Sequence, residues 1–212
     1  SGRRAGLCRA GSLVATAAAF LSKEAGLATP FLLAAHETFS RGGDPSLARR
    51  TRLARLAPHV ALVPLYFVAR RLALGSMAPL TRWNLSPGGT LLALLARVGD
   101  DARRLLFPFG FSAFVPFHPP ASPFAPRVLC GAAAVAVAAW SAWRLVRARS
   151  PLATPLAWLV LPLVPTLYLP GLGEVVTADR YLSLSSVGFA LLAAFALDAA
   201  ALRAPAFAGR LA

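Results

Sequence analysis

Three residues with chemically useful side chains, Asp179, Arg180 and Tyr181, stand directly before a long apolar run that begins at Leu182. A carboxylate can take a proton from an attacking hydroxyl, and a guanidinium can hold a phosphate through parallel hydrogen bonds. Charges near lipid are costly, so an acid and a base at the mouth of an apolar helix indicate a site at one face of a membrane. We therefore expect these residues to line a site for a lipid-borne phosphate or sugar.

A second ionic cluster, formed by Lys23 and Glu24 after Ser22, interrupts the apolar stretch 11–37 near its centre. Basic residues flank this stretch on both sides, and the positive-inside tendency places both flanks on the cytoplasmic side. A hairpin of two short helices that turns at Ser22–Lys23–Glu24 satisfies this requirement, whereas a single span does not. Each arm then holds about 13 residues, fewer than the roughly 20 that normally span a bilayer.

The composition is that of a membrane protein. The chain is 57% hydrophobic and only 14% charged, whereas about a quarter of the residues are charged in ordinary soluble domains. Its 22 basic and 8 acidic residues give a net charge of +14. Most arginines lie between apolar stretches, and no motif that combines basic and aromatic residues for base recognition is visible. We therefore predict no nucleic-acid partner.

Metal and cofactor signatures are missing from the sequence. His36, His59 and His118 are far apart, Cys8 and Cys130 belong to no CxxC pair, and neither phosphate-loop nor dinucleotide motifs occur. The sequence predicts neither a metal site nor a cofactor.

The hydropathy pattern predicts an all-α, polytopic bundle of about six transmembrane spans, forming one membrane domain over residues 1–212. The hairpin supplies two spans. Residues 75–92 are expected to form a surface loop, and 91–112 an interfacial helix, whose charges pair with one another at the outer surface. The four remaining spans are expected at 57–74, 128–143, 152–170 and 182–202.

The predicted topology divides the charged residues between the two faces of the membrane. The basic stretches 3–9, 41–55, 144–149 and 203–210 fall on the cytoplasmic side. The opposite face receives the remaining ionic groups, namely the Lys23 turn, Arg70 and Arg71, the segment around Asp100, and the cluster Asp179, Arg180 and Tyr181. We expect these groups to share a polar cavity.

Three stretches of the chain resemble membrane-embedded glycosyltransferases of the GT-C type. FLSKEAGLATPFLLAAHE at 20–37 is similar to their "SKE…P" helix break, and ADRYLSLSSVGFALLAAF at 178–195 resembles their "ADRYLYLPSIGF" element. RLLFPFGFSAFVPFHPP at 104–120 resembles "LLFPLGLSADYPW", which lies between them. The order and spacing resemble those of O-mannosyltransferase-like proteins that also carry tetratricopeptide repeats, which this chain lacks.

Such enzymes move a sugar from a polyprenyl-phosphate carrier to a protein or glycan acceptor on the non-cytoplasmic face. The resemblance implies that Lys23 lies near the carrier phosphate and that Glu24 orients it. It also implies that Asp179, Arg180 and Tyr181 border the same cavity, with Asp179 or Glu24 as the catalytic base. Arg70 and Arg71 are candidates for phosphate contact, or for snorkelling to the surface.

The chain departs from that family in two respects. The family's principal catalytic acid lies in the first outer loop, and no counterpart is found after Ser1, so we expect a fragment of a larger protein that is inactive alone. YLSLSS at 181–186 replaces the family's YLYLPS. The Ala, Arg, Leu and Pro bias suggests a bacterial inner membrane, with the site facing the periplasm or exterior.

Other interpretations of the same residues stay open. Lys23 with Glu24 can be a local ion pair at a helix break, and Asp179 can favour the start of a helix. A secondary transporter also uses broken helices and buried charges. A non-catalytic membrane scaffold would have the same composition.

Overall fold

The structure, a computed structural model, describes residues 2–39, 49–75, 85–109, 117–167 and 179–203. Every regular element in these ranges is a helix, so the predicted all-α class is confirmed. The elements in chain order are α1 (Gly2–Ser22), η1 (Glu24–Ala28), α2 (Thr29–Phe39), α3 (Arg49–Leu74), α4 (Pro87–Leu106), α5 (Pro126–Arg147), α6 (Ala153–Val160), η2 (Val164–Leu167), η4 (Asp179–Leu182) and α7 (Ser183–Arg203).

Three helices in the described ranges are long and apolar enough to cross a membrane: Arg4–Ser22, Pro126–Arg147 and Ser183–Leu202. The last two coincide with the spans predicted at 128–143 and 182–202. The chain therefore has the features of an integral membrane protein. The predicted total of about six spans is not confirmed, because α3 does not belong to this group and Ala153–Leu167 is a shorter apolar segment.

Helices α1 and α2 form at the place of the predicted hairpin, but α1 is longer than the predicted first arm. The break itself falls where expected, because α1 ends at Ser22 and Lys23 is extended, with φ −165° and ψ 150°. However, α1 begins at Gly2 and is 21 residues long, so it can span alone and is no short arm. Arginine and alanine are good helix formers, which explains why the helix runs through the basic start of the chain.

The predicted span 152–170 is interrupted. Helix α6 ends at Val160, and a turn leads to the short η2 segment. Pro162 is the physical reason, because it lacks the backbone N–H that the next helical hydrogen bond would need. The interruption brings η2 beside η1, since these two short elements are in contact.

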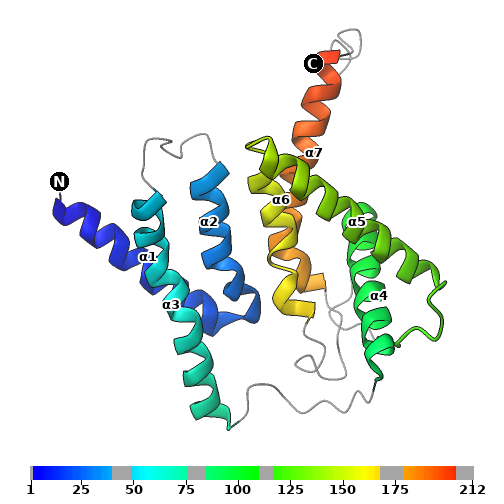
Figure 1. The fold of residues 1–212 in the computed structure, drawn as a ribbon, viewed down its shortest axis with the longest axis horizontal. Coiled ribbons are helices and arrows are strands. Elements are labelled where there is room, and N and C mark those ends of the chain that lie inside the picture. Colours follow the sequence, from blue (N-terminus) through cyan, green and yellow to red (C-terminus); the bar gives the residue numbers. More distant parts are fainter. Residues whose placement is uncertain (1, 40–48, 76–84, 110–116, 168–178, 204–212) are drawn as a thin grey trace.

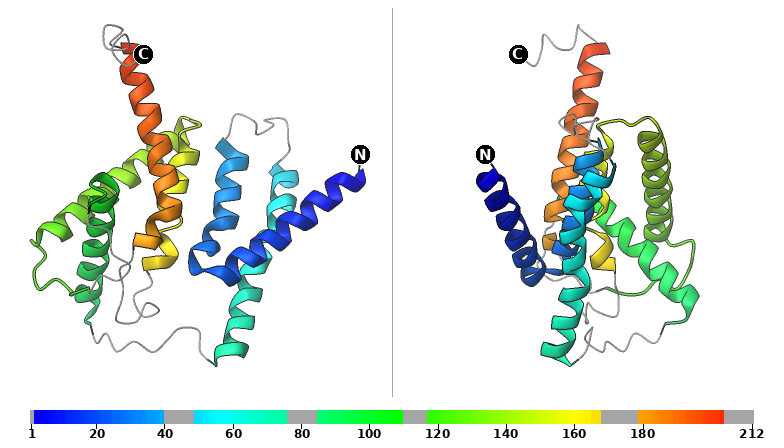
Figure 2. Two further views of the ribbon diagram at one scale, coloured as in Figure 1. Left: turned by 180° about the vertical axis from the view of Figure 1, so that it is seen from behind. Right: turned by 60° about the vertical axis from the view of Figure 1, so that its left-hand side comes forward.

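The helix ends sort into two groups (Figure 1). One end of the molecule carries the start of α1, the end of α2, the start of α3, the end of α5 and the end of α7. The turn between α1 and α2, the end of α3, the start of α4, and η4 with the start of α7 lie toward the other end. Figure 2 shows the same sorting from behind. The basic ends of α1, α3 and α5 thus lie together, whereas the end of α4, which carries Asp100, does not lie with the Lys23 turn as the charge pattern predicts (Figure 1).

Small residues allow close approach between the helices that frame the site. A Cβ placed on Gly99 in α4 would collide with the Arg127 carbonyl oxygen in α5, and one on Gly131 would collide with the Leu95 carbonyl oxygen. Gly188 makes the same kind of approach between α7 and the backbone of α6. Packing through small residues is the usual way for membrane helices to come together. It fixes α4 on α5 and α7 on α6.

Candidate functional site

Lys23 lies between α1 and η1 with its side chain over an aromatic ring from the far end of the sequence. Its Nζ is 4.4 Å from the centroid of the Tyr181 ring. The helix break makes this possible, because extended Lys23 turns the chain and Gly26 packs directly on the Ala19 carbonyl, where a Cβ would collide. The structure therefore brings together two of the predicted site residues.

Arg97 of α4 reaches the same ring. Its guanidinium carbon is 5.6 Å from the Tyr181 centroid, and its Nε donates a hydrogen bond of 3.0 Å to Oδ2 of Asp101. Arg97 is 0% and Asp101 1% exposed, so the ion pair is fully buried. Their i, i+4 spacing places both on one face of α4. The site thus combines two cations, one carboxylate and one aromatic ring.

Two opposing effects act on the pKa of the Asp101 carboxyl group. Burial raises the pKa of Asp101 above its ordinary value, whereas the positive charges of Arg97 and Arg104 act in the opposite direction. Its Oδ2 accepts from Arg97, while its Oδ1 is buried and accepts no hydrogen bond from the described residues. A buried carboxylate of this kind holds the guanidinium of Arg97 in place, because separating the pair would leave a bare charge in low dielectric.

The prediction for the charges of 91–112 is wrong for one pair. The sequence analysis expected these charges at the outer surface, yet Arg97 and Asp101 are enclosed by protein, whereas Arg103 is exposed. Arg97 was absent from the predicted site residues. The signal that could have identified it is the i, i+4 spacing of opposite charges inside an otherwise apolar pattern.

Three other predicted site residues have side chains outside the part of the chain that the structure describes: Glu24, Asp179 and Arg180. The backbone of Asp179 and Arg180 belongs to η4, which ends at Leu182 and leads directly into α7. The element that carries this pair therefore also presents Tyr181 to Lys23 and Arg97.

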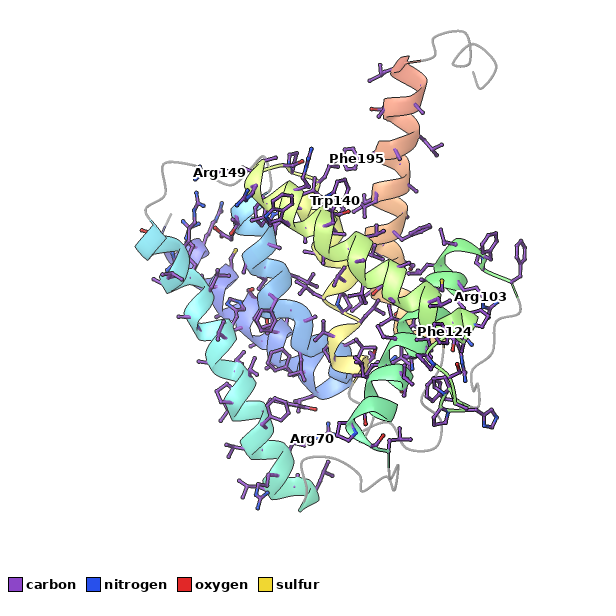
Figure 3. The ribbon with its side chains drawn as sticks, turned by 45° about the vertical axis from the view of Figure 1, so that its right-hand side comes forward. Arg70, Arg103, Phe124, Trp140, Arg149 and Phe195 are labelled. Atoms are coloured by element: carbon purple, nitrogen blue, oxygen red, sulfur yellow. The ribbon has the colours of Figure 1, made fainter. Side chains whose placement is uncertain are left out.

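The predicted contacts Arg70 and Arg71 lie at the end of α3 (Figure 3). Arg70 donates a hydrogen bond of 2.6 Å to the Tyr66 hydroxyl, and the Tyr66 ring meets that of Phe20 edge to face, with centroids 5.9 Å apart. Tyr66 thus links α3 to α1 near the Lys23 break, while Arg71 is exposed. The contacts described for Arg70 join it to Tyr66 within α3.

An apolar cleft of about 510 Å³ lies between α4, α5 and α6. Val98 and Ala102 line it from α4, Ala138 from α5, and Leu156 from α6, and Val164 of η2 also belongs to its lining. Val98 follows Arg97 directly in the chain, so the same helix contributes both to the ionic cluster and to the cleft. The apolar cleft and the ionic cluster would together suit a ligand that has a long apolar chain and a charged head group.

The chemistry open to this site is the binding of an anion. Among the described residues in direct contact around Tyr181, two cations and one carboxylate leave one net positive charge, which attracts an anion such as a phosphate. Among the described residues, no group of three or more His, Cys, Asp or Glu side chains is placed to hold a metal ion. Comparison of the chain with protein-family models, curated proteins and solved structures finds no match.

Proposed function

We propose that this chain is part of a membrane glycosyltransferase that takes a sugar from a polyprenyl-phosphate carrier. The observation that carries the proposal is the convergence of Lys23, Arg97 and Tyr181 from three separate elements. A buried cation beside a second, more accessible one suits a phosphate ester better than a neutral solute. We identify the anion as the phosphate of a polyprenyl carrier because three stretches of the chain resemble GT-C elements, namely 20–37, 104–120 and 178–195.

In the proposed reaction, the acceptor hydroxyl oxygen attacks the anomeric carbon and the bond from that carbon to the phosphate oxygen breaks. The released phosphate gains negative charge, which Lys23 and Arg97 stabilise. Asp101 keeps Arg97 oriented and does not contact the sugar. Glu24 or Asp179 is proposed to take the hydroxyl proton. The carrier's apolar tail would follow the cleft that Val98 helps to line.

The proposed setting is a bacterial inner membrane, with the site at the periplasmic or exterior face. Support comes from the basic helix ends, which gather away from the Lys23 turn in Figure 1. Under the positive-inside tendency, the end that carries Lys23 and Tyr181 is then the non-cytoplasmic one. The partners are a lipid-linked sugar donor and a protein or glycan acceptor.

Binding of a polyprenyl phosphate to the purified chain in detergent tests the proposal without requiring turnover. Lys23→Gln is expected to weaken binding roughly tenfold, the amount typical of a lost charge-assisted hydrogen bond. Arg103→Gln is the matched control, because it removes an exposed cation from α4 and leaves the cluster intact. Equal binding by the two variants would remove Lys23 from the site.

Transfer is measured separately, with a labelled carrier-linked sugar and an acceptor. The Lys23→Gln form is expected to lose transfer while Arg103→Gln retains it. Uptake of solute into vesicles without any transfer would favour a transporter instead.

A further inference from the structure

The end of α5 opposite the candidate site carries two arginine–tryptophan pairs. The guanidinium carbon of Arg144 is 5.6 Å from the Trp140 ring centroid, and that of Arg147 is 4.8 Å from the Trp143 ring centroid. Both rings are largely exposed, at 60% and 51%. We propose that these two pairs form a binding site for the phosphate headgroup of an anionic membrane phospholipid.

The four side chains share one face of the helix. At 100° per residue, Trp140, Trp143, Arg144 and Arg147 fall within an arc of about 100°. The residues of α5 that line the apolar cleft, such as Ala138 and Ala142, point in the opposite direction. Figure 3 shows Trp140 on the outer side of α5, and Arg149 just beyond the end of this helix. The pairs therefore face the surroundings of the protein and not its interior.

The side chains of Arg144 and Arg147 are not needed to cap the end of α5. The backbone N–H groups of Ala148, Arg149 and Ser150 donate to the carbonyl oxygens of Arg144, Val146 and Leu145, at 3.0 to 3.1 Å. These bonds satisfy three of the last carbonyls of α5 through the backbone alone. Arg149 makes the turn possible with a φ of 47°, a conformation that few residues other than glycine adopt.

The charge of this surface is not compensated by nearby acids along the chain. The sequence contains no Asp or Glu between Asp101 and Glu174. A guanidinium over a ring face keeps its N–H edges available, and two such edges can grip a phosphate. The indoles anchor at the depth where headgroups lie, because their rings favour the membrane–water interface. Since α5 is a candidate span, its end meets this interface.

Tryptophan fluorescence in lipid vesicles tests the proposal directly. In a reporter form with Trp83→Phe and Trp158→Phe, only Trp140 and Trp143 remain of the four tryptophans. We expect brominated phosphatidylglycerol to quench them more strongly than brominated phosphatidylcholine. The expected preference is roughly fivefold for each arginine engaged. Equal quenching by the two lipids would overturn the proposal.

Variants of the reporter form separate the paired arginines from general positive charge. The double variant R144Q/R147Q is expected to lose the preference for phosphatidylglycerol, whereas Arg103→Gln on α4 retains it. An unchanged preference in the double variant would also overturn the proposal. If the double variant does not fold, the parent reporter still decides, because concentrated salt must then lower its preference.

Free phosphate is the competing occupant. Inorganic phosphate at millimolar concentration is expected to leave the lipid preference intact, because the tail and the interface hold the headgroup in place. If inorganic phosphate abolishes the preference, the surface binds a soluble anion and the lipid proposal is wrong.

Discussion

The ammonium group of Lys23 stands 4.4 Å from the centre of the Tyr181 ring, although these residues belong to elements near opposite ends of the chain. The break after α1 delivers the lysine, and η4 delivers the ring. Arg97 approaches the same ring from α4. Tyr181 is therefore the shared contact through which the first, middle and last parts of the chain meet.

The Lys23–Tyr181 contact can be measured as a coupling energy. We expect the double variant Lys23→Gln/Tyr181→Leu to reveal a coupling of about 0.5–2 kcal/mol in the free energy of unfolding, the range of cation–π contacts. Tyr181→Phe should retain most of it, because the ring face is kept. The same cycle with Trp140→Leu in place of Tyr181→Leu serves as the control and should show no coupling. A zero value for both cycles would mean that the contact contributes nothing to stability.

Removing one member of the buried pair Arg97–Asp101 should destabilise the protein more than removing both. Asp101→Leu alone leaves Arg97 buried with neither counter-charge nor hydrogen-bond acceptor, and breaking a buried pair typically costs about 3–5 kcal/mol. The double variant Arg97→Met/Asp101→Leu removes both charges and should recover most of that stability. It should still bind polyprenyl phosphate weakly, since the cation is gone. Thermal unfolding and binding of the same samples separate the two effects, and strong binding by the double variant would contradict a role for Arg97.

The raised pKa of Asp101 predicts the direction in which its ionisation changes the folding stability as the pH rises. Because burial raises the folded-state pKa above the ordinary value, the protonated form favours folding, and this stabilisation is lost as the pH rises through the folded pKa. Thermal unfolding followed as the pH is raised from the ordinary pKa of an aspartate should therefore show a falling contribution. Asp101→Asn should remove that part of the slope. Asp198→Asn, an exposed change on α7, should leave it.

Much of the helical framework could be predicted from the sequence, because hydropathy and breakers are local signals. The spans at 128–143 and 182–202 correspond to α5 and α7, and the charged residues after Leu21 marked the end of α1. The interruption of α6 at Pro162 was missed because a hydropathy average ignores what a proline removes. The length of α1 was missed because arginines were interpreted as ends, although they form helix well.

The site could be predicted only in part, because its contacts are long-range. The sequence predicted that Lys23 and Tyr181 border one cavity, and in the structure these two side chains are in contact. It did not predict that Arg97 and Asp101 would be buried. A charge inside an apolar pattern looks like a surface charge until its partner is known, and the i, i+4 partner was present four residues away.

Gly26 is the residue whose lack of a side chain keeps Lys23 at the site. A Cβ at this position would collide with the Ala19 carbonyl, so η1 would have to move away from α1. We expect Gly26→Ala to destabilise the fold by about 1–3 kcal/mol, as overpacking does. It should also weaken polyprenyl-phosphate binding, because Lys23 moves with the turn. Gly11→Ala in α1 is the matched control, since nothing lies within 4 Å of its added Cβ and alanine favours the helix. Thermal unfolding and binding of both variants check the expectation. Identical behaviour of the two would show that the close approach of η1 to α1 does not position Lys23.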